Sequence, residues 1–167
     1  MAGALIVTAE IAQGDFSWLE GLRRAHYPAD RNQVPAHLTV FHALPPSFES
    51  ELRRRLGRVV RRRPPSATIA GLMDLGGGVA YRVVSSDLDD IRDELADELH
   101  GMLGAQDSGG WRPHITIQNK VAPKVARALK EQLERTFEPR PLAISGLAIQ
   151  RYCDGPWERV AAYPFRP

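Results

Sequence analysis

The chain has 167 residues, a formal net charge of +2, a hydrophobic fraction of 43% and a charged fraction of 25%. These values are ordinary for a soluble globular protein, and the length suits one domain or two small lobes that share a core. The single cysteine, Cys153, excludes an intramolecular disulfide framework and a multi-cysteine zinc site. No stretch is apolar for long enough to cross a bilayer, and the apolar run at residues 5–7 lacks a basic leader. We therefore expect a cytoplasmic protein with no membrane segment.

Strand and helix patterns alternate along the chain. Runs of β-branched residues predict strands, apolar residues at helical spacing predict helices, and Pro or Gly clusters separate them. The first half contains a predicted strand at 4–11, helix at 16–27, strand at 37–44, helix at about 47–62 and strand at 67–75. The second half contains a strand at 79–85, helix at about 85–103, strand at 112–120, helix at 123–137 and strand at 142–152, then an added strand at 158–163.

The two halves therefore repeat one order of elements, strand, helix, strand, helix, strand. Three glycines at 76–78 separate the halves and predict a hairpin turn, because no helix with Lys-Ser/Thr follows as in a phosphate loop. Residues 104–110 predict a Gly/Ser loop. Alternating elements with hairpin-joined neighbours favour an α+β or α/β protein in which two sheets face each other.

The middle strand of each half carries the same short motif of histidine, aliphatic residue, threonine and aliphatic residue. It reads HLTV at residues 37–40 and HITI at residues 114–117. Side chains alternate between the two faces of a strand, so each histidine and its threonine point one way while the aliphatic residues point into the core. A single motif of this kind is more often structural. Two at matching positions indicate a shared site.

The same alternation sorts the neighbouring residues. Phe41 shares the parity of His37, and Gln118 that of His114, so both are expected to line the cleft. His42 has the opposite parity and is interpreted as structural, unless a bulge shifts the register.

Two facing histidines allow three kinds of chemistry. They could bind a metal, but no acidic or cysteine ligand accompanies either motif. One could activate a nucleophile, but the chain has no G-x-S-x-G elbow. They could instead act as an acid–base pair on a phosphodiester, since an imidazole is useful in both protonation states near neutral pH. The threonine hydroxyls would then donate hydrogen bonds to the non-bridging phosphate oxygens. Only this last option uses every polar residue of both motifs.

The segments HLTVFHALPP and RPHITIQNK resemble the motifs of the 2H phosphoesterase superfamily, in particular its bacterial 2′-5′ RNA ligase / cyclic phosphodiesterase branch. Chain length, motif spacing and element order agree over essentially all 167 residues. The resemblance implies an α+β, bilobal and pseudo-symmetric fold in which two antiparallel or mixed sheets face a central cleft, with helices outside. It implies a single domain over residues 1–167, with lobes at roughly 1–77 and 78–167 that can exchange strands.

The resemblance also implies a metal-independent phosphodiesterase acting on 2′,3′-cyclic phosphate ends or 2′-5′ linkages of RNA or small nucleotides, without a cofactor. At the matching positions, His37 and His114 would be the acid–base pair and Thr39 and Thr116 the phosphate ligands. Which histidine is the acid, and whether hydrolysis or ligation occurs, stay open. Arg112 is a further candidate for binding substrate. We expect a monomer.

Aromatic residues near the motifs could stack on a nucleobase. The candidates are Phe41, Tyr27 and Tyr81, and we expect at least two of them to belong to the core instead.

Two other functions remain open from the sequence. The segment from Arg53 to Arg63 holds seven arginines and no acid, which could make the protein a non-catalytic RNA-binding module or could simply be a solvated helix face. A metal-dependent hydrolase that uses the same two histidines is the third hypothesis.

Overall fold

The computed structural model describes residues 3–167, and it confirms the predicted α+β class. The strands are β1 Leu5–Ile11, β2 Leu38–Leu44, β3 Ser66–Asp74, β4 Val79–Val84, β5 His114–Gln118, β6 Arg140–Tyr152 and β7 Trp157–Pro164. The helices are α1 Gln13–His26, α2 Glu49–Val59, α3 Ser86–Glu98, α4 Ala105–Ser108 and α5 Pro123–Glu134, with 3-10 turns at Ala29–Arg31 and Pro46–Phe48. None of the helices within residues 3–167 is long and apolar enough to cross a membrane.

All strand pairings are antiparallel, and they follow the order β2-β1-β6-β3-β4-β5, with β7 also paired to β6. The two expected sheets are two parts of this seven-stranded sheet, joined through the 13-residue strand β6. Residues 140–143 of β6 pair with β3, and the rest of the strand pairs with β1 and β7. Each part of the sheet therefore contains a strand from the other half of the chain.

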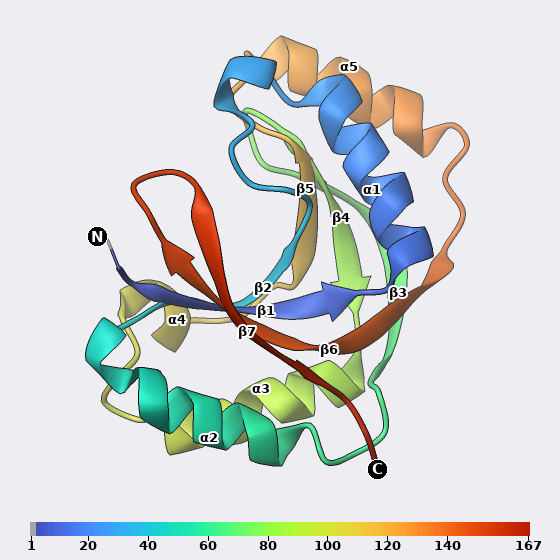
Figure 1. The fold of residues 1–167 in the computed structure, drawn as a ribbon. Coiled ribbons are helices and arrows are strands. Elements are labelled where there is room, and N and C mark those ends of the chain that lie inside the picture. Colours follow the sequence, from blue (N-terminus) through green and yellow to red (C-terminus); the bar gives the residue numbers. More distant parts are fainter. Residues whose placement is uncertain (1–2) are drawn as a thin grey trace.

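The strands that carry the motifs, β2 and β5, stand at opposite ends of this order. They nevertheless contact each other, because the sheet curls until its two ends meet (Figure 1). The curl places the two histidine motifs side by side although they are far apart in the sequence.

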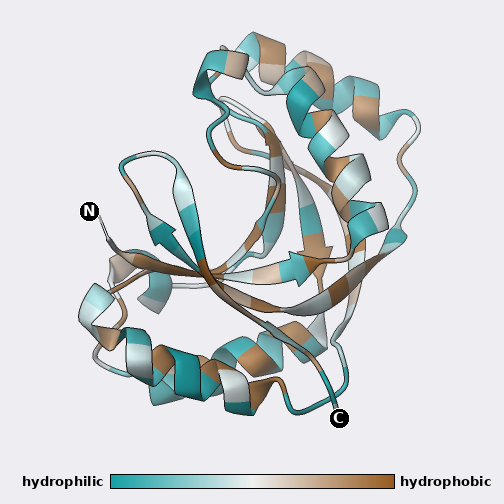
Figure 2. Cartoon of the chain, viewed as in Figure 1, coloured by the Kyte–Doolittle hydropathy of each residue, from teal (hydrophilic) through white to brown (hydrophobic). Residues whose placement is uncertain are grey.

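Helices pack against both parts of the sheet (Figure 1). Helices α2 and α3 lie next to each other, and hydrophilic and hydrophobic residues alternate along both of them (Figure 2). Their apolar residues, Leu52, Leu56 and Val59 of α2 and Leu88, Ile91 and Leu95 of α3, are buried. Helix α1 contacts β5, and α5 contacts β3 and β4. Helix α1 thus covers the outermost strand β5, and α5 covers the two strands before it in the order.

The turn at residues 76–78 is a hairpin between β3 and β4, as predicted, and it lies against the end of β5. Gly76 has a φ of 83°, which favours glycine. A Cβ on Gly78 would clash with the carbonyl oxygen of Gln118, so a side chain there would displace β5.

A β-bulge interrupts the alternation in each motif strand. Thr8 of β1 pairs with Thr39, but Val7 pairs with Phe41, so β2 contains one extra residue at Val40. In the same way, β4 pairs Ala80 with Thr116 and Val79 with Gln118, so β5 contains one extra residue at position 117.

The bulges reverse the faces on which the residues after them were expected to lie. Phe41 is fully buried and Gln118 is 3% exposed, so neither lines the cleft. Conversely, the side chain of His42 is 33% exposed and lies on the cleft side. The expectation that Phe41 lines the cleft is wrong because the alternation argument assumed an unbroken strand.

Replacing Phe41 by alanine should therefore act on stability. We expect Phe41→Ala to lower the free energy of unfolding by about 3–5 kcal/mol, because it removes a fully buried ring and leaves a cavity. Chemical denaturation measures this loss. Val84→Ala, at a residue 49% exposed, is the control and should change stability by less than about 0.5 kcal/mol. Equal effects in the two variants would contradict the burial of Phe41.

Candidate active site

The four polar residues of the two motifs lie around one cavity of about 320 Å³. His37, just before β2, and Thr39 come from one side, and His114 and Thr116 of β5 come from the other. Their aliphatic neighbours in the motifs are fully buried and anchor the two strands in the core. The remaining lining residues are His42, Gln106, Gly110, Trp111, Arg112 and Trp157.

The two motif histidines are held by the same kind of hydrogen bond. Nδ1 of His37 lies 2.8 Å from the carbonyl oxygen of Pro35, and Nδ1 of His114 lies 2.7 Å from that of Arg112. A carbonyl can only accept, so Nδ1 carries the proton in both rings. The neutral form of each ring therefore has its lone pair on Nε2, the nitrogen left for a ligand.

His37 lies in an environment that disfavours its charged form. Burial is the main reason that its pKa falls to about 4 from its ordinary value of 6.5. The hydrogen bond to Pro35 acts in the opposite direction, while the positive charges of Arg23, His114 and His42 lower the pKa further. His37 is therefore neutral at pH 7 in the free protein, and its Nε2 can accept a proton.

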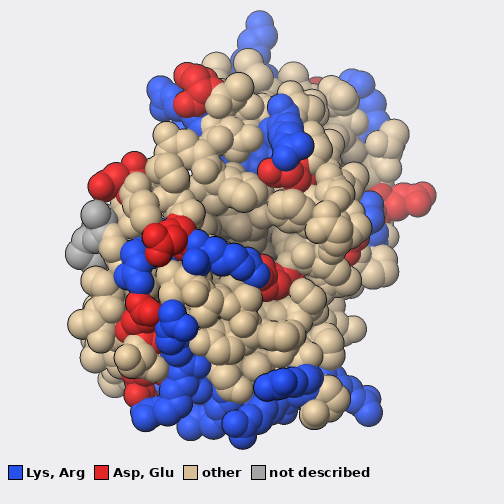
Figure 3. Space-filling view, viewed as in Figure 1, with Lys and Arg blue, Asp and Glu red and all other residues tan. Residues whose placement is uncertain are grey.

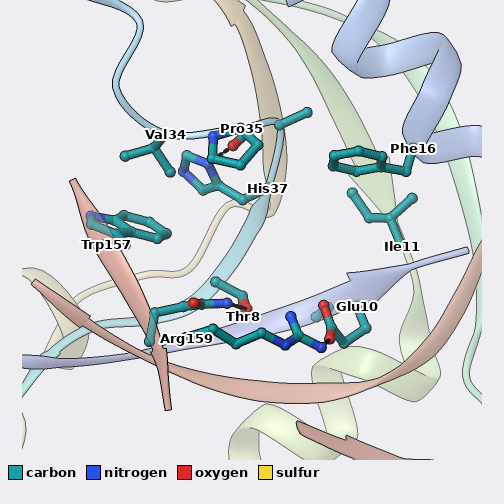
Figure 4. Close-up of a pocket in the computed structure, with 12 residues that line it drawn as sticks. Thr8, Glu10, Ile11, Phe16, Val34, Pro35, His37, Trp157 and Arg159 are labelled. Carbon is teal, nitrogen blue, oxygen red and sulfur yellow. Dashed lines mark hydrogen bonds and ion pairs between the residues drawn. The ribbon is translucent and has the colours of Figure 1, made fainter. Parts of the chain in front are cut away.

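A second cavity of about 290 Å³ opens beside His37 (Figure 4). The His37 ring faces it across from Trp157, whose ring centroid lies 4.6 Å from that of the imidazole. Phe16 and Ile11 form an apolar wall, and Glu10 pairs with Arg159 at the floor. His37 and Trp157 border both cavities, so the two spaces adjoin at the histidine.

Arg112 does line the first cavity, as expected, and its side chain is exposed. Its carbonyl also holds His114, so the residue contributes through its backbone as well. Tyr27 and Tyr81, the other aromatic candidates for stacking, are buried. Tyr27 packs under the guanidinium of Arg23 at 4.2 Å, and Tyr81 packs against aromatic residues of α1 and the segment after α5. With Phe41, all three belong to the core.

Two buried arginines hold the motif strands, and no pattern in the sequence pointed to them. Arg23 of α1 donates from Nη1 to the carbonyl oxygen of Thr116 at 2.9 Å. Arg92 of α3 donates from Nε to the carbonyl oxygen of Val40 at 3.2 Å, at the bulge of β2. Both bonds satisfy carbonyl groups at irregular or outer positions of the sheet.

The segment predicted as a Gly/Ser loop contains the short helix α4 and a buried acid, Asp107. Its carboxylate accepts hydrogen bonds from the backbone N–H groups of His42 and Ala43, at 2.8–3.0 Å, and from Nδ1 of His42 at 2.9 Å. Burial alone would raise the pKa of Asp107, but these hydrogen bonds outweigh it and hold the pKa below its usual value. Asp107 is therefore ionised at neutral pH.

The sequence patterns did not identify Trp111 as a site residue either. Its indole Nε1 donates to the carbonyl oxygen of Thr39 at 3.2 Å, so the residue just before the second motif fixes the backbone of the first.

Within residues 3–167, no group of three or more His, Cys, Asp or Glu side chains is placed to hold a metal ion.

The low pKa of Asp107 makes a prediction about stability and pH. A carboxyl group with a depressed pKa stabilises the fold fully above its ordinary pKa of 3.8, and that contribution is lost as the pH falls through the lower folded-state value. We expect Asp107→Asn to be less stable by about 2–3 kcal/mol at pH 7, with the difference from wild type shrinking below about pH 4.

Urea unfolding at several pH values measures this difference. Asp97→Asn, at an exposed position of α3, is the matched control and should lose little stability at any pH. A stability difference for Asp107→Asn that stays constant down to pH 2 would contradict the assignment.

Comparison with known proteins identifies the family of the chain. The family model of the 2′-5′ RNA ligase superfamily matches residues 11–156. The chain therefore belongs to the 2′-5′ RNA ligase superfamily, and the predicted membership of the 2H phosphoesterases is confirmed. No curated protein sequence matches the chain.

Solved structures share the fold over the whole chain at low identity. TT0787 of Thermus thermophilus is 16% identical with a TM-score of 0.68, and the match covers 98% of each chain. E. coli LigT complexed with 3′-AMP is 16% identical with a TM-score of 0.67, and a protein described as a phosphoesterase is 16% identical with a TM-score of 0.65; both matches cover 100% of each chain.

Proposed function

We propose that the protein is a metal-independent phosphodiesterase that acts on 2′,3′-cyclic phosphate ends or 2′-5′ linkages of RNA or small nucleotides. One observation carries this proposal: two histidines face one cavity, and each has Nδ1 bonded to a backbone carbonyl and Nε2 left for a ligand. Membership of the superfamily supports a phosphoesterase. The threonine beside each histidine supplies a hydroxyl donor for the phosphate.

The environment of His37 suggests the roles of the two histidines. Neutral His37 takes a proton from water through Nε2, and the water oxygen attacks phosphorus. His114, in its protonated form, donates a proton from Nε2 to the ribose oxygen as its bond to phosphorus breaks. The hydroxyls of Thr39 and Thr116 donate hydrogen bonds to the non-bridging oxygens, where negative charge concentrates in the transition state. The products are a phosphomonoester and a free ribose hydroxyl.

The second cavity supplies a place for the nucleoside. It adjoins the reacting centre at His37, and it combines the aromatic rings of Phe16 and Trp157 with the polar pair Glu10 and Arg159. A nucleobase has an apolar face and polar edges, so it matches this lining. We place the base of the substrate there and the phosphate in the first cavity.

The alternative of an RNA-binding module finds less support. Of the seven arginines from Arg53 to Arg63, five form ion pairs. The acidic partners are Glu49 and Glu51 of α2 and Glu94 and Glu98 of α3. Figure 3 shows blue side chains along the lower edge of the molecule, with red side chains beside them on its left side. Much of the positive charge is therefore balanced within the protein, and the surface shares no residue with the first cavity.

Removing either motif histidine should abolish most activity. We expect His37→Ala and His114→Ala each to lower kcat/KM for a 2′,3′-cyclic mononucleotide by about 10²–10⁴-fold, because each loses one proton-transfer step. Turnover assays with and without a chelator measure this loss. The chelator should have no effect on wild type.

The control for these variants is His100→Ala, at an exposed histidine that does not line the cavity. It should keep wild-type turnover. Full activity in His37→Ala or His114→Ala would rule out the two-histidine mechanism, and loss of activity with the chelator would point to the metal-dependent alternative.

The role of His37 as the base predicts a pH profile. The pKa of His37 is about 4, so the ring stays unprotonated and competent as a base throughout the neutral and mildly acidic range. We expect the acid limb of kcat/KM to fall near pH 4. NMR titration of the imidazole resonances, with the His37 signal assigned by its absence in His37→Gln, should give the same value. An acid limb at pH 6–7 would assign the base to another group.

A further inference from the structure

A third histidine, His42, lines the cavity that holds the two motif histidines. It reaches the cavity because of the bulge at Val40, and about one third of its side chain is exposed there. Its Nδ1 lies 2.9 Å from Oδ1 of Asp107, a carboxylate that is 1% exposed. Nδ1 therefore donates to the carboxylate, and Nε2 is left for a ligand.

The structural role of Asp107 does not explain why residue 42 is a histidine. The carboxylate already accepts from the backbone N–H groups of His42 and Ala43, and any residue at position 42 would provide the first of these. The side chain at position 42 is thus free to be apolar, yet it is an imidazole that borders the cavity of about 320 Å³ between the two motifs.

The carboxylate distinguishes His42 from the motif histidines. Nδ1 of His37 and of His114 donates to a neutral carbonyl group, whereas Nδ1 of His42 donates to an ionised carboxylate. When Nε2 of His42 carries a proton, the carboxylate of Asp107 balances the charge of the ring. A charge-balanced imidazolium with an exposed N–H is a donor suited to a phosphate oxygen.

The position of His42 sets which phosphate it can reach. It lies three residues beyond Thr39, but the bulge takes up one of them, so the two residues are about two strand steps apart, roughly 7 Å along β2. It is absent from the lining of the second cavity, which opens at His37 on the other side of Thr39. The ribose next to the phosphate at His37 and His114 would therefore direct its base into the second cavity and its other phosphate towards His42.

We propose that His42, supported by Asp107, binds a second phosphate group of the substrate, separated by one ribose from the phosphate that reacts. Two phosphates attached to one ribose, each hydrogen-bonded to the protein, can span the distance along β2 between Thr39 and His42. The substrate class is then an oligonucleotide end or a nucleoside bisphosphate, in preference to a mononucleotide with one phosphate. This inference rests on the proposed function for the position of the reacting phosphate.

Binding of two product-like ligands tests this inference without catalysis. The probes are 3′-AMP, with one phosphate, and adenosine 3′,5′-bisphosphate, with two, titrated by calorimetry at fixed ionic strength. We expect wild type to bind the bisphosphate about tenfold more tightly, the effect of one charge-assisted hydrogen bond. In His42→Gln the ratio of the two dissociation constants should fall towards one. His100→Gln, the matched control, should keep the wild-type ratio.

Asp107→Asn gives a second and independent variant. It keeps an acceptor oxygen beside the backbone of β2 but removes the charge behind the ring, so it should also reduce the ratio. Equal affinities in wild type, or a preference that His42→Gln leaves unchanged, would overturn the inference.

The outcome is separable from that of the proposed function. If the protein hydrolyses no cyclic phosphate but prefers the bisphosphate through His42, the inference stands and the proposed reaction is contradicted. If the protein hydrolyses cyclic phosphates but His42 has no effect on the ratio of the two dissociation constants, the reaction stands and the inference is contradicted.

Discussion

Strand β6 pairs with β3 over its first residues and with β1 and β7 over the rest, so the two parts of the sheet are held by one backbone. Every other feature of the site depends on this pairing. The motif strands β2 and β5 are the outermost strands of the order, and they meet because the sheet curls about β6 (Figure 1). A cavity between two sheet ends, lined by one face of each, follows from that curl.

In each half of the chain, an arginine is hydrogen-bonded to the backbone of the motif strand of the other half. Arg23 lies in the first helix of the first half and bonds to the backbone of β5, while Arg92 lies in the first helix of the second half and bonds to the backbone of β2. Both guanidinium groups also lie over aromatic rings, Tyr27 for Arg23 and Phe41 for Arg92. Burial of such groups is costly unless they are hydrogen-bonded, so these contacts favour one position of each motif strand against its helix.

The sequence predicted the elements and the four motif residues because these depend on local patterns: periodicity, Pro and Gly punctuation, and a repeated motif. It failed where a long-range contact decided the outcome. The bulge at Val40 depends on the partner strand β1 and on Arg92, more than 50 residues away, so alternation placed Phe41 and His42 on the wrong faces. Asp107 stood alone in a glycine-rich segment, and nothing local linked it to His42. Family membership could be predicted because the motifs are short and contiguous.

Asp107 also has a consequence for how the protein behaves in solution. Strand β2 ends the order of strands, and an outer strand with free N–H groups is a template on which another chain can add a strand. The carboxylate occupies the N–H groups of His42 and Ala43 and places a buried negative charge where an incoming backbone would have to bond. The residue that supports the third histidine thereby also occupies the N–H groups of β2 on which a strand of another chain would pair.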